Sequence, residues 1–592
     1  MTAASNSWKR SHTCGELRAA DVGKSVTVMG WVDSHRDFGA FRFITLRDRF
    51  GVVQLKFDPS NAAVFDVSQS LRPEWVVGVR GKVISRGENI NAKMATGEIE
   101  IEVDVVEVFS KADVPKFPIR DEVDAAEELR LQYRFLDLRR RPLQNNIVMR
   151  AEVTHIVRSF LHDEGFLDLE TPILTKSTPE GARDYLVPSR VHPGEFYALP
   201  QSPQLFKQLY MVAGFDRYFQ ICRCFRDEDL RADRQPEFTQ IDMEMSFIDE
   251  ADIMDVSERM IARIWKAIHG VELQTPLPRM TYAESMLRFG VDNPDLRYGV
   301  EIQEVSELVA NCGFAVFASA VADGGVVRAL SVPAEFSRKQ VDGYTDLVKR
   351  VGLKGLAWAK VGAEGWSGPI AKFFSPEEQQ ALNERLGAEV GHTLLFGADK
   401  AKVVAPALGQ LRKSIAADLG LNKKGEWKFT WITEFPLLEH DEEAGRWVSV
   451  HHPFTSPRVE DIPLMDTDPG KVRARAYDLV LNGNELGGGS IRIHDTEMQT
   501  RVFKSLGIDE DEAQLRFGFL LKALSHGAPP HGGLAFGLDR IIMLLSGADS
   551  LRDVIAYPKT ASAACLMTEA PSDVDARQLT DLHIKTDVKV KE

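Results

Sequence analysis

The segment Gly532-Gly533-Leu534-Ala535-Phe536-Gly537-Leu538-Asp539-Arg540 carries the most specific pattern in this chain. It predicts a strand that leads into an apolar helix, because Ile541, Ile542, Leu544 and Leu545 follow directly. Glycines let the backbone approach a ligand closely, and an arginine at the junction suits bidentate contact with phosphate oxygens. The chain has neither a GxxxxGK[ST] loop nor a strand–GxGxxG–helix unit. P-loop and Rossmann nucleotide sites are therefore not supported.

Upstream of this segment, two predicted strands share one polar face. Phe225-Arg226-Asp227-Glu228 follows a strand over Tyr218–Cys224, and a polar loop separates it from a second strand. In the second strand, apolar and polar residues alternate: Ile241, Met243, Met245 and Phe247 against Gln240, Asp242, Glu244 and Ser246. An antiparallel pair with one hydrogen-bonding face can form the floor of a binding site. A solvated edge hairpin is the plainer interpretation of the same pattern.

A third segment, from Asp478 to Arg492, contains a run of glycines and several charged residues. Alternation along a strand predicts that Ser490 and Arg492 face away from Ile491 and Ile493. Asp478 and Glu485 offer carboxylate oxygens, the ligands that Mg²⁺ prefers. For any single carboxylate a surface position is the simpler interpretation, but the cluster favours a site.

Two shorter stretches add candidate groups. Residues 201–207, Gln-Ser-Pro-Gln-Leu-Phe-Lys, combine amides with a lysine. His451 and His452 are neighbours, and on a strand they would point to opposite faces. We therefore expect at most one of the two imidazoles to enter a pocket, and we do not expect a metal site there.

Residues 15–110 alternate between short strands and turn signals, which predicts a small Greek-key barrel of the OB type. The strands are expected at Val26–Val32, Phe41–Arg47, Val52–Phe57, Trp75–Ile84 and Ile99–Val108. In the last strand the apolar phase slips at Val106, as a β-bulge would produce. Five strands in about a hundred residues are typical of such a barrel.

One strand of the predicted barrel has aromatic residues on the face opposite its core. Ile44 and Leu46 share the core face, so Phe41 and Phe43 must occupy the other. Arg36, Arg47, Gln54 and Lys56 are expected near these rings. Aromatic rings with basic and amide neighbours suit stacking on a single-stranded RNA loop. Covering one end of the barrel is an equally good interpretation of the pattern.

The middle of the chain contains a predicted long helix and a change of composition. A charged stretch at 111–128 is typical of a linker. Between Asn145 and Glu164 the apolar residues follow a helical period, at Val148, Val153, Ile156, Val157, Phe160 and Leu161. Gly165 ends the helix, and a short strand, Phe166–Leu169, leads to Pro172. From about Pro294 to Gly420 a glycine-rich α/β pattern interrupts the other motifs, which indicates an inserted domain.

Composition limits the class of protein. A chain of 592 residues with 44% hydrophobic and 27% charged residues is expected to form about three to four globular domains. The net charge of −15 argues against indiscriminate nucleic-acid binding but allows a local basic surface. Five scattered cysteines favour a reducing compartment, with Cys222 and Cys224 as structural residues. The absence of an apolar leader or long apolar run predicts a cytoplasmic protein that does not span a membrane.

Together the three segments resemble the class II aminoacyl-tRNA synthetases. The long helix, short strand and Pro172 are similar to motif 1 of that family, which builds its dimer interface. Phe225-Arg226-Asp227-Glu228 is similar to motif 2, and Gly537-Leu538-Asp539-Arg540 to motif 3. An OB barrel before the catalytic domain resembles class IIb, the aspartyl, asparaginyl and lysyl enzymes.

The resemblance is closest to the bacterial aspartyl-tRNA synthetases and runs from Cys14 to about Glu569. Ser177 to Asp184, Gln201 to Lys207 and Phe225 to Gln240 are similar to segments of these enzymes. Phe396-Gly397-Ala398-Asp399 is similar to the tripeptide that names their GAD insertion. The resemblance implies an α+β multidomain fold: a five-stranded OB barrel, an antiparallel-sheet catalytic domain and an inserted α/β GAD domain.

The expected domain boundaries follow from this comparison. Residues 1–110 would form the anticodon-binding barrel, and 111–140 a linker. The catalytic domain would occupy 141–294 and 421–592, the latter with a C-terminal extension. Residues 295–420 would form the GAD insertion between the two parts. A homodimer is expected, joined mainly through the helix 145–164 and the strand 166–170, although that helix could also pack inside its own domain.

The resemblance also implies a role for individual residues. Arg226, Glu485 and Arg540 would be catalytic. The expected aspartate-binding residues are Glu180, Ser202, Gln204, Lys207, Arg226, Asp242, His451 and Arg492. The expected ATP-binding residues are Arg226, Asp227, Glu228, Gln235, Phe238, Glu485, Gly537, Leu538, Asp539 and Arg540. Asp478 and Glu485 would bind Mg²⁺, and Arg36, Phe38, Phe43 and Gln54 would contact the tRNA anticodon.

The expected chemistry is activation of L-aspartate by ATP to aspartyl-adenylate, followed by transfer to the 3′ end of tRNA-Asp. The carboxylate nucleophile is already an anion, so positioning and charge neutralisation replace a general base. One alternative is a relaxed enzyme that also charges tRNA-Asn. Arg36-Asp37 is followed by Phe38, which is neither the leucine of strict forms nor the histidine of relaxed forms. A non-catalytic RNA-binding relative and a free asparagine-forming ligase are less favoured.

Overall fold

The computed structural model describes residues 8–178, 182–228 and 234–587. Contacts divide the chain into two compact units. The first comprises the N-terminal residues up to Asn145 together with Cys565–Ala570, and the second comprises the remainder. Within the described residues no helix is both long enough and apolar enough to cross a membrane.

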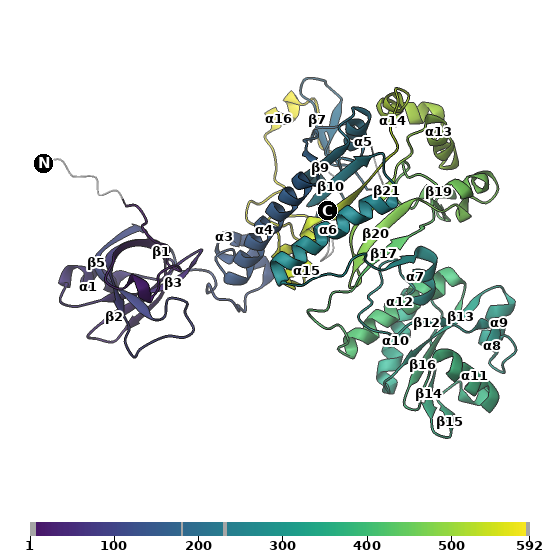
Figure 1. The fold of residues 1–592 in the computed structure, drawn as a ribbon, viewed down its shortest axis with the longest axis horizontal. Helices are drawn as coiled ribbons and strands as arrows, with labels where there is room; N and C mark the ends of the chain where they lie inside the picture. Colours follow the sequence, from purple (N-terminus) through teal and green to yellow (C-terminus); the bar gives the residue numbers. More distant parts are fainter. Residues whose placement is uncertain (1–7, 179–181, 229–233, 588–592) are drawn as a thin grey trace. The chain divides into compact units, whose positions relative to one another are not determined.

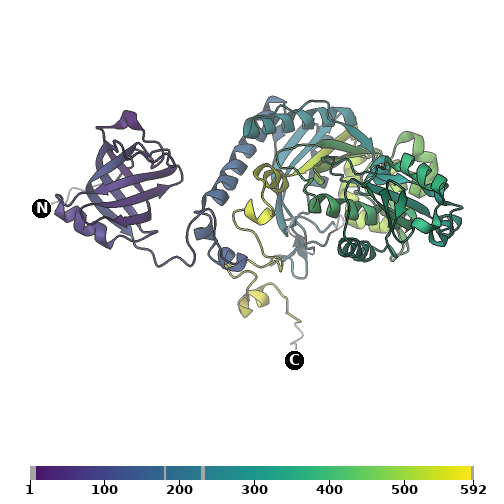
Figure 2. The ribbon, with the colours of Figure 1, turned by 90° about the horizontal axis from the view of Figure 1, so that it is seen from below.

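The first unit contains the predicted five-stranded closed barrel, with strand order β1-β2-β3-β5-β4 (Figure 2). Its strands are β1 Ser25–Asp37, β2 Arg42–Asp48, β3 Gly51–Phe57, β4 Val76–Ser85 and β5 Ile99–Ser110. Helix α1, Ala62–Ser70, was not predicted and lies between β3 and β4 in the chain. The bulge in β5 falls at Asp104, because Val103 pairs with Gly81 and Val105 with Arg80. It therefore precedes the predicted phase slip at Val106 by two residues.

The second unit is built on an eight-stranded sheet with the order β11-β17-β20-β21-β22-β10-β9-β6. The strands in that order are Arg279–Thr281, Phe429–Thr433, Ala476–Leu481, Asn484–Ile491, His531–Gly537, Glu237–Ser246, Arg217–Phe225 and Leu167–Asp168. The central pairs are antiparallel, and only the outer pairs β11–β17 and β6–β9 are parallel. The predicted hairpin β9–β10 is thus central in the sheet, which excludes the solvated edge interpretation.

Three helices cover the apolar side of this sheet: α4 Arg141–Asp163, α6 Glu250–His269 and α15 Leu538–Ser546 (Figure 1). Trp265 of α6 and Trp431 of β17 are fully buried in the shared core. Asp249 caps the start of helix α6, because its carboxylate accepts hydrogen bonds from the first-turn amides. Gly270, with a left-handed φ of 68°, caps its end.

The apolar side of α4 packs mainly inside its own chain. Val153, Val157, Phe160 and Leu161 are buried in the core against the sheet, whereas Val148 is 46% exposed. Most apolar residues of this helix are therefore covered by their own chain, so they do not need a partner subunit to be buried.

A separate five-stranded sheet lies in the chain between β11 and β17 (Figure 1). Its order is β12-β13-β16-β14-β15, with strands Ile302–Glu304, Val326–Val332, Thr393–Asp399, Ala357–Gly362 and Gly365–Ser367. Its helices are α8 Ser306–Val309, α9 Ala315–Ala322, α10 Arg338–Arg350, α11 Pro376–Leu386 and α12 Ala401–Asp418. Two apolar clusters on this sheet share no residue with the core of the larger sheet.

The remaining elements are short. They are α2 Glu127–Gln132, α3 Arg134–Asp137, α5 Gln204–Val212, α7 Tyr282–Arg288, α13 Thr496–Ser505, α14 Glu510–Leu524 and α16 Ala576–Asp581. Two hairpins complete the fold, β7 Leu186–Pro188 with β8 Phe196–Ala198, and β18 Leu438–Asp441 with β19 Arg446–Ser449.

We expect Val157→Ala to destabilise the second unit by about 1–3 kcal/mol, because it removes two buried methyl groups and leaves a cavity. The matched change Val459→Ala, at a side chain that is 72% exposed, should have almost no effect. Urea unfolding followed by tryptophan fluorescence measures both, since Trp265 and Trp431 report on this core. Equal stability of the two variants would show that α4 is not packed as described.

Candidate active site

A cavity of about 560 Å³ opens in the second unit, between β10, β21 and β22, helix α5 and the adjoining loops. Most of the residues predicted for the amino acid, nucleotide and metal sites line it. They are Ser202, Gln204, Lys207, Arg226, Glu228, Gln235, Phe238, Asp242, His451, Asp478, Glu485, Arg492, Gly537, Asp539 and Arg540. The three segments singled out in the sequence therefore meet at one site.

Three predicted residues are not among its lining. The side chain of Leu538 is buried in the core, so only its backbone could face a ligand. Asp227 lies outside the lining, and its carboxylate is 3.6 Å from Arg183. Glu180 falls outside the described residues.

At one end of the cavity, two cations and two carboxylates form a buried network. Lys207 Nζ lies 2.6 Å from Asp242 Oδ1 and 3.3 Å from Glu244 Oε2. The Arg492 guanidinium donates to both Glu244 oxygens, through Nε at 2.9 Å and Nη2 at 3.1 Å. All four side chains are almost completely buried. Glu244, which was placed on the polar face but given no role, links the two cations.

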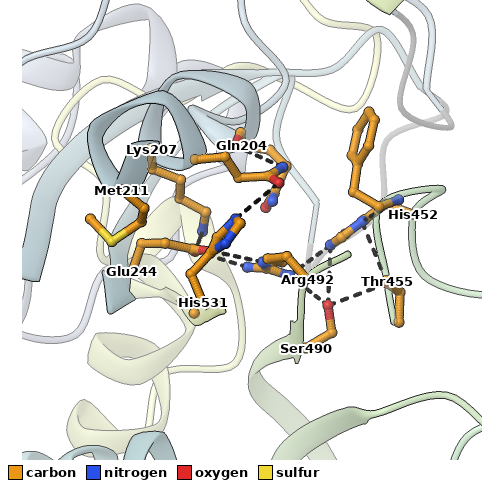
Figure 3. Close-up of polar contacts among 12 residues, drawn as sticks. Gln204, Lys207, Met211, Glu244, His452, Thr455, Ser490, Arg492 and His531 are labelled. Carbon is orange, nitrogen blue, oxygen red and sulfur yellow. Dashed lines mark hydrogen bonds and ion pairs between the residues drawn. The ribbon is translucent and has the colours of Figure 1, made fainter. Parts of the chain in front are cut away.

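The contacts of Arg492 leave it little freedom. Its Nη1 donates to Ser490 Oγ at 2.6 Å and to His452 Nε2 at 2.7 Å (Figure 3). Since Nε and Nη2 are engaged by Glu244, one Nη2 hydrogen remains without a partner among the described residues. Lys207 likewise has one ammonium hydrogen beyond its bonds to the two carboxylates. The pair can therefore offer one hydrogen bond each to a ligand carboxylate.

Three other buried polar atoms in this cavity lack hydrogen-bond partners within the described part of the chain. They are Asp242 Oδ2, Gln204 Nε2 and His451 Nε2. Buried polar atoms are almost always satisfied in native proteins, so such a group indicates a missing ligand or water. Asp242 Oδ2 is an acceptor and Gln204 Nε2 a donor, whereas His451 Nε2 lies at ion-pair distance, 3.4 Å, from Asp478 Oδ1. A ligand with one ammonium and a carboxylate would satisfy this set.

Both imidazoles of the His451-His452 pair line the cavity, so the expectation that only one could enter is wrong. That argument assumed a strand, whereas residues 450–454 have no strand structure, and neighbours in a loop are not forced to opposite sides. His452 accepts a hydrogen bond from Arg492, and His451 Nε2 lies 3.4 Å from Asp478 Oδ1.

Burial and the neighbouring cations act in opposite directions on the two carboxyl groups of the network. Burial raises the pKa of Asp242 to about 6, against the lowering effect of Lys207. Burial also opposes ionisation of Glu244, but Arg492 and Lys207 outweigh it and lower the pKa of that carboxyl. Burial and the charge of Arg492 hold the pKa of His452 well below its usual value, so this imidazole is neutral.

The other end of the cavity has groups suited to a nucleotide. The Arg226 guanidinium lies 5.1 Å from the centre of the Phe238 ring, and Glu228 pairs with Arg234 at 2.8 Å. The Gln235 amide binds both backbone groups of Lys559, accepting from its nitrogen at 2.8 Å and donating to its oxygen at 3.1 Å. In this structure Gln235 therefore holds the 559 segment in place.

Arg540 and Asp539 are positioned differently although they are neighbours. Arg540 donates to the backbone oxygen of Glu485 at the edge of the cavity. The buried Asp539 carboxylate accepts from Thr239 N at 2.8 Å and from Arg150. Asp539 thus joins α15 to β10 and α4, which is a structural role. Arg540 lines the cavity.

Asp478 and Glu485 converge where β21 has no side chain. A β-carbon at Gly488 would lie 2.3 Å from Asp478 Oδ1 and 3.6 Å from Glu485 Oε1. No group of three or more metal-ligating side chains occurs among the described residues. Two carboxylate donors nevertheless fit Mg²⁺ that is shared with phosphate oxygens, because this ion commonly uses one or two carboxylates in nucleotide sites. Asp292 also lines the cavity, and sequence reasoning missed it because its segment has no motif.

The aromatic face of the barrel agrees only partly with expectation. Ile44 and Leu46 are fully buried and Phe43 is partly exposed, which confirms the predicted strand parity. Phe43 packs edge-on against the exposed Phe38, with ring centres 5.8 Å apart.

Two of the polar neighbours expected on that face are engaged elsewhere. Arg47 is buried in ion pairs with Glu74 and Asp33, both at 2.8 Å, so it is not a free basic group. The Gln54 amide is also buried, and it donates to Glu100 at 2.7 Å. Arg36, by contrast, is exposed at the end of β1.

Family models match both units of this chain. Residues 126–561 match the family of class II tRNA synthetases for D, K and N, and residues 26–109 match the OB-fold nucleic acid binding domain. The first match covers the cavity and all three segments described above.

Relatives and solved structures agree with these family matches. Proteins named Aspartate–tRNA(Asp/Asn) ligase from Syntrophotalea carbinolica and Geotalea uraniireducens are each 58% identical over 98% of this chain and 98% and 99% of their own. The Aspartate–tRNA ligase of Geobacillus kaustophilus is 54% identical over 97% of this chain and 98% of its own. The structure of asparaginyl-tRNA synthetase from Pyrococcus horikoshii supports the fold, with a TM-score of 0.58, 18% identity and coverage of 93% and 98%. With identities this high over whole chains, the chain belongs to the class II tRNA synthetases of the D, K and N group and, within it, to the bacterial-type aspartyl-tRNA synthetases.

Proposed function

We propose that this enzyme activates L-aspartate with ATP and transfers it to both tRNA-Asp and tRNA-Asn. The observation that carries the amino acid assignment is the set of unpartnered groups at one end of the cavity. Asp242 Oδ2 would accept from the aspartate ammonium, and Lys207 and Arg492 would each donate to its side-chain carboxylate. A lysine substrate would instead require carboxylates at the position of the two cations.

The activation step needs orientation and charge neutralisation rather than a base. Arg226, which lies beside Phe238 in the cavity, would hold the aspartate α-carboxylate and the ATP α-phosphate together. The α-carboxylate oxygen attacks the α-phosphorus, and pyrophosphate leaves with the electron pair of the broken P–O bond. Phe238 would stack under adenine, and Arg540 would contact the outer phosphate. Preorganised cations of this kind are commonly the largest contribution to such catalysis.

Asp478 and Glu485 are the residues that would hold Mg²⁺, which neutralises phosphate charge when bound. In the second step a hydroxyl of the tRNA terminal ribose attacks the carbonyl carbon of aspartyl-adenylate, and AMP leaves. Glu180, Ser202 and Gln204 would complete the ammonium site; of these, Ser202 and Gln204 line the cavity. These individual roles stay predictions.

The relaxed tRNA specificity is the better supported of the two original alternatives. The relatives that are 58% identical are named for both tRNA-Asp and tRNA-Asn, and so are two relatives that are 54% identical, whereas the Geobacillus kaustophilus relative, also 54% identical, is named Aspartate–tRNA ligase. Strict charging of tRNA-Asp, our first expectation, therefore gives way to charging of both. The site that reads the anticodon would be the face of the barrel with Phe43, Phe38 and Arg36.

We also propose a homodimer, joined through the exposed part of the expected helix and strand and through the residues that follow them. Val148 of α4, Leu167 of β6, Ile173 and Leu174 are each 43–53% exposed and occur close together in sequence. Apolar side chains left exposed at the start and end of one helix–strand segment are suited to a subunit interface. The assignment of residues 295–420 to a GAD insertion likewise stays a prediction.

The tRNA specificity can be tested with two transcripts that differ at one base. A tRNA-Asp transcript and its variant with the last anticodon base changed from C to U, which converts an aspartate into an asparagine anticodon, should both accept aspartate. Aminoacylation with radiolabelled aspartate measures both rates. Charging of the C form alone would return the enzyme to the strict class.

We expect the amino acid site to reject asparagine. Replacing the substrate carboxylate by an amide leaves two buried cations short of a partner, a loss of about 3–5 kcal/mol, or more than a hundredfold in kcat/KM. Pyrophosphate exchange with each amino acid measures this ratio. Arg492→Lys should reduce it, whereas Arg473→Lys, at a half-exposed ion pair with Asp461, should not. Similar kcat/KM for aspartate and asparagine in the unmodified enzyme contradicts the assignment.

The barrel should contribute to tRNA charging but not to aspartate activation. Phe43→Ala is expected to lower kcat/KM for tRNA by about ten- to a hundredfold, because one stacked base is worth about 1–3 kcal/mol. Pyrophosphate exchange should stay near normal. Phe50→Ala, at an exposed ring in the β2–β3 turn, is the control and should charge tRNA almost normally. Normal charging by Phe43→Ala would show that this ring only covers the barrel.

A further inference from the structure

The segment of residues 289–300 connects α7 of the large sheet to β12 of the inserted sheet, and it contributes Asp292 to the cavity. Asp292 is an exposed residue that lines this cavity. It lines the same cavity as Asp478. Burial has the larger effect on the Asp292 carboxyl and the negative charge of Asp478 the smaller, and both raise its pKa. A third negative group therefore stands beside the two carboxylates assigned to Mg²⁺.

One buried arginine of the inserted region holds this segment. Arg412, on α12, donates to the backbone oxygens of Asp295 and Tyr298 at 2.9 and 2.8 Å, and to that of Val300. Its guanidinium also lies 4.8 Å from the Phe289 ring and 4.3 Å from the Tyr298 ring. The side chain is only 2% exposed and makes no ion pair among the described residues. A buried cation used in this way needs all of its hydrogen bonds, so it fixes the segment firmly.

Close contacts fix the segment near its start and in its middle. A β-carbon at Gly290 would lie 2.1 Å from the backbone oxygen of Ala405 on α12, and the φ of Gly290 is 72°. Toward the large sheet, Asp295 Cβ is 3.3 Å from the position of a β-carbon at Gly483. Gly483 lies in the turn between β20 and β21, the strands that carry Asp478 and Glu485. The segment is thus held between α12 and the hairpin of the two carboxylates.

We propose that the inserted region positions Asp292 as a third carboxylate at the nucleotide end of the active site. There Asp292 strengthens the binding of the divalent cation that accompanies ATP, without being one of its two protein ligands. This inference rests on the proposed assignment of Asp478 and Glu485. It gives the inserted region a part in catalysis, through the Arg412 contacts that hold residues 289–300 in place.

The direct test compares Asp292→Asn with the unmodified full-length enzyme. Removing one charge at about 6 Å from a divalent ion in water-like surroundings changes its binding by about tenfold. We therefore expect Mn²⁺, titrated in the presence of a non-hydrolysable ATP analogue and followed by electron paramagnetic resonance, to bind about tenfold more weakly. The Mg²⁺ concentration for half-maximal pyrophosphate exchange should rise by the same factor, while the KM for aspartate stays unchanged.

Three further single variants and one double variant separate this role from a structural one. Glu301 directly follows the segment, and its carboxylate pairs with Arg288 outside the cavity. Glu301→Gln removes this charge and should leave Mn²⁺ binding unchanged. Asp292→Glu should restore most of the affinity. Arg412→Lys, which loses the multiple carbonyl contacts, should weaken Mn²⁺ binding, and adding Asp292→Asn to it should have little further effect.

Unchanged Mn²⁺ affinity in Asp292→Asn overturns the proposal, as does an equal loss in Glu301→Gln. Failure of the underlying assignment is recognised separately, because Asp478→Asn would then leave Mn²⁺ binding intact. Thermal unfolding of each variant, followed by circular dichroism, shows whether a loss of affinity comes from unfolding.

Discussion

The alternation of charges Lys207, Asp242, Glu244 and Arg492 is the constraint on which the rest of the catalytic unit depends. These side chains come from α5, β10 and the end of β21, so they meet only if the sheet order brings β10 and β21 to either side of β22. Once buried, each charge needs its neighbours, because an unpaired ion in this environment is strongly destabilising. The network therefore selects one register of the central strands.

In the proposed assignment, the same network shows how buried charged side chains can still offer hydrogen bonds to a ligand in the cavity. Two cations and two carboxylates balance one another in the chain, while single hydrogen-bonding positions on Asp242, Lys207 and Arg492 stay available. Glu244, Asp242, Ser490 and His452 together take up most of the hydrogen-bonding capacity of the two cations and thereby limit what these can offer to a ligand. Specificity then depends on a few fixed hydrogen bonds rather than on net charge.

Strand parity was the most productive sequence argument, because alternation is a local property of the backbone. It correctly placed Asp242 beside Glu244 on a polar face, and Phe43 opposite Ile44. It failed for His451 and His452, where the chain is a loop and no alternation applies. It also could not show that Arg47 and Gln54 are bound by Glu74 and Glu100, since those contacts join residues far apart in sequence. Asp292 was missed because its segment has no motif, and only the fold brings it to the cavity.

The chain leaves the large sheet after β11, forms the second sheet, and returns to the large sheet at β17. Strands β11 and β17 are parallel neighbours. The two ends of the excursion therefore lie on neighbouring strands, at opposite ends of the strand pair, and the order of the strands in the large sheet does not depend on what lies between them. A region whose two ends lie on neighbouring strands can be lengthened or replaced without a change in the strand order of the sheet that carries it. The fold can thus accept sequence changes in the same connection that passes close to the hairpin of Asp478 and Glu485.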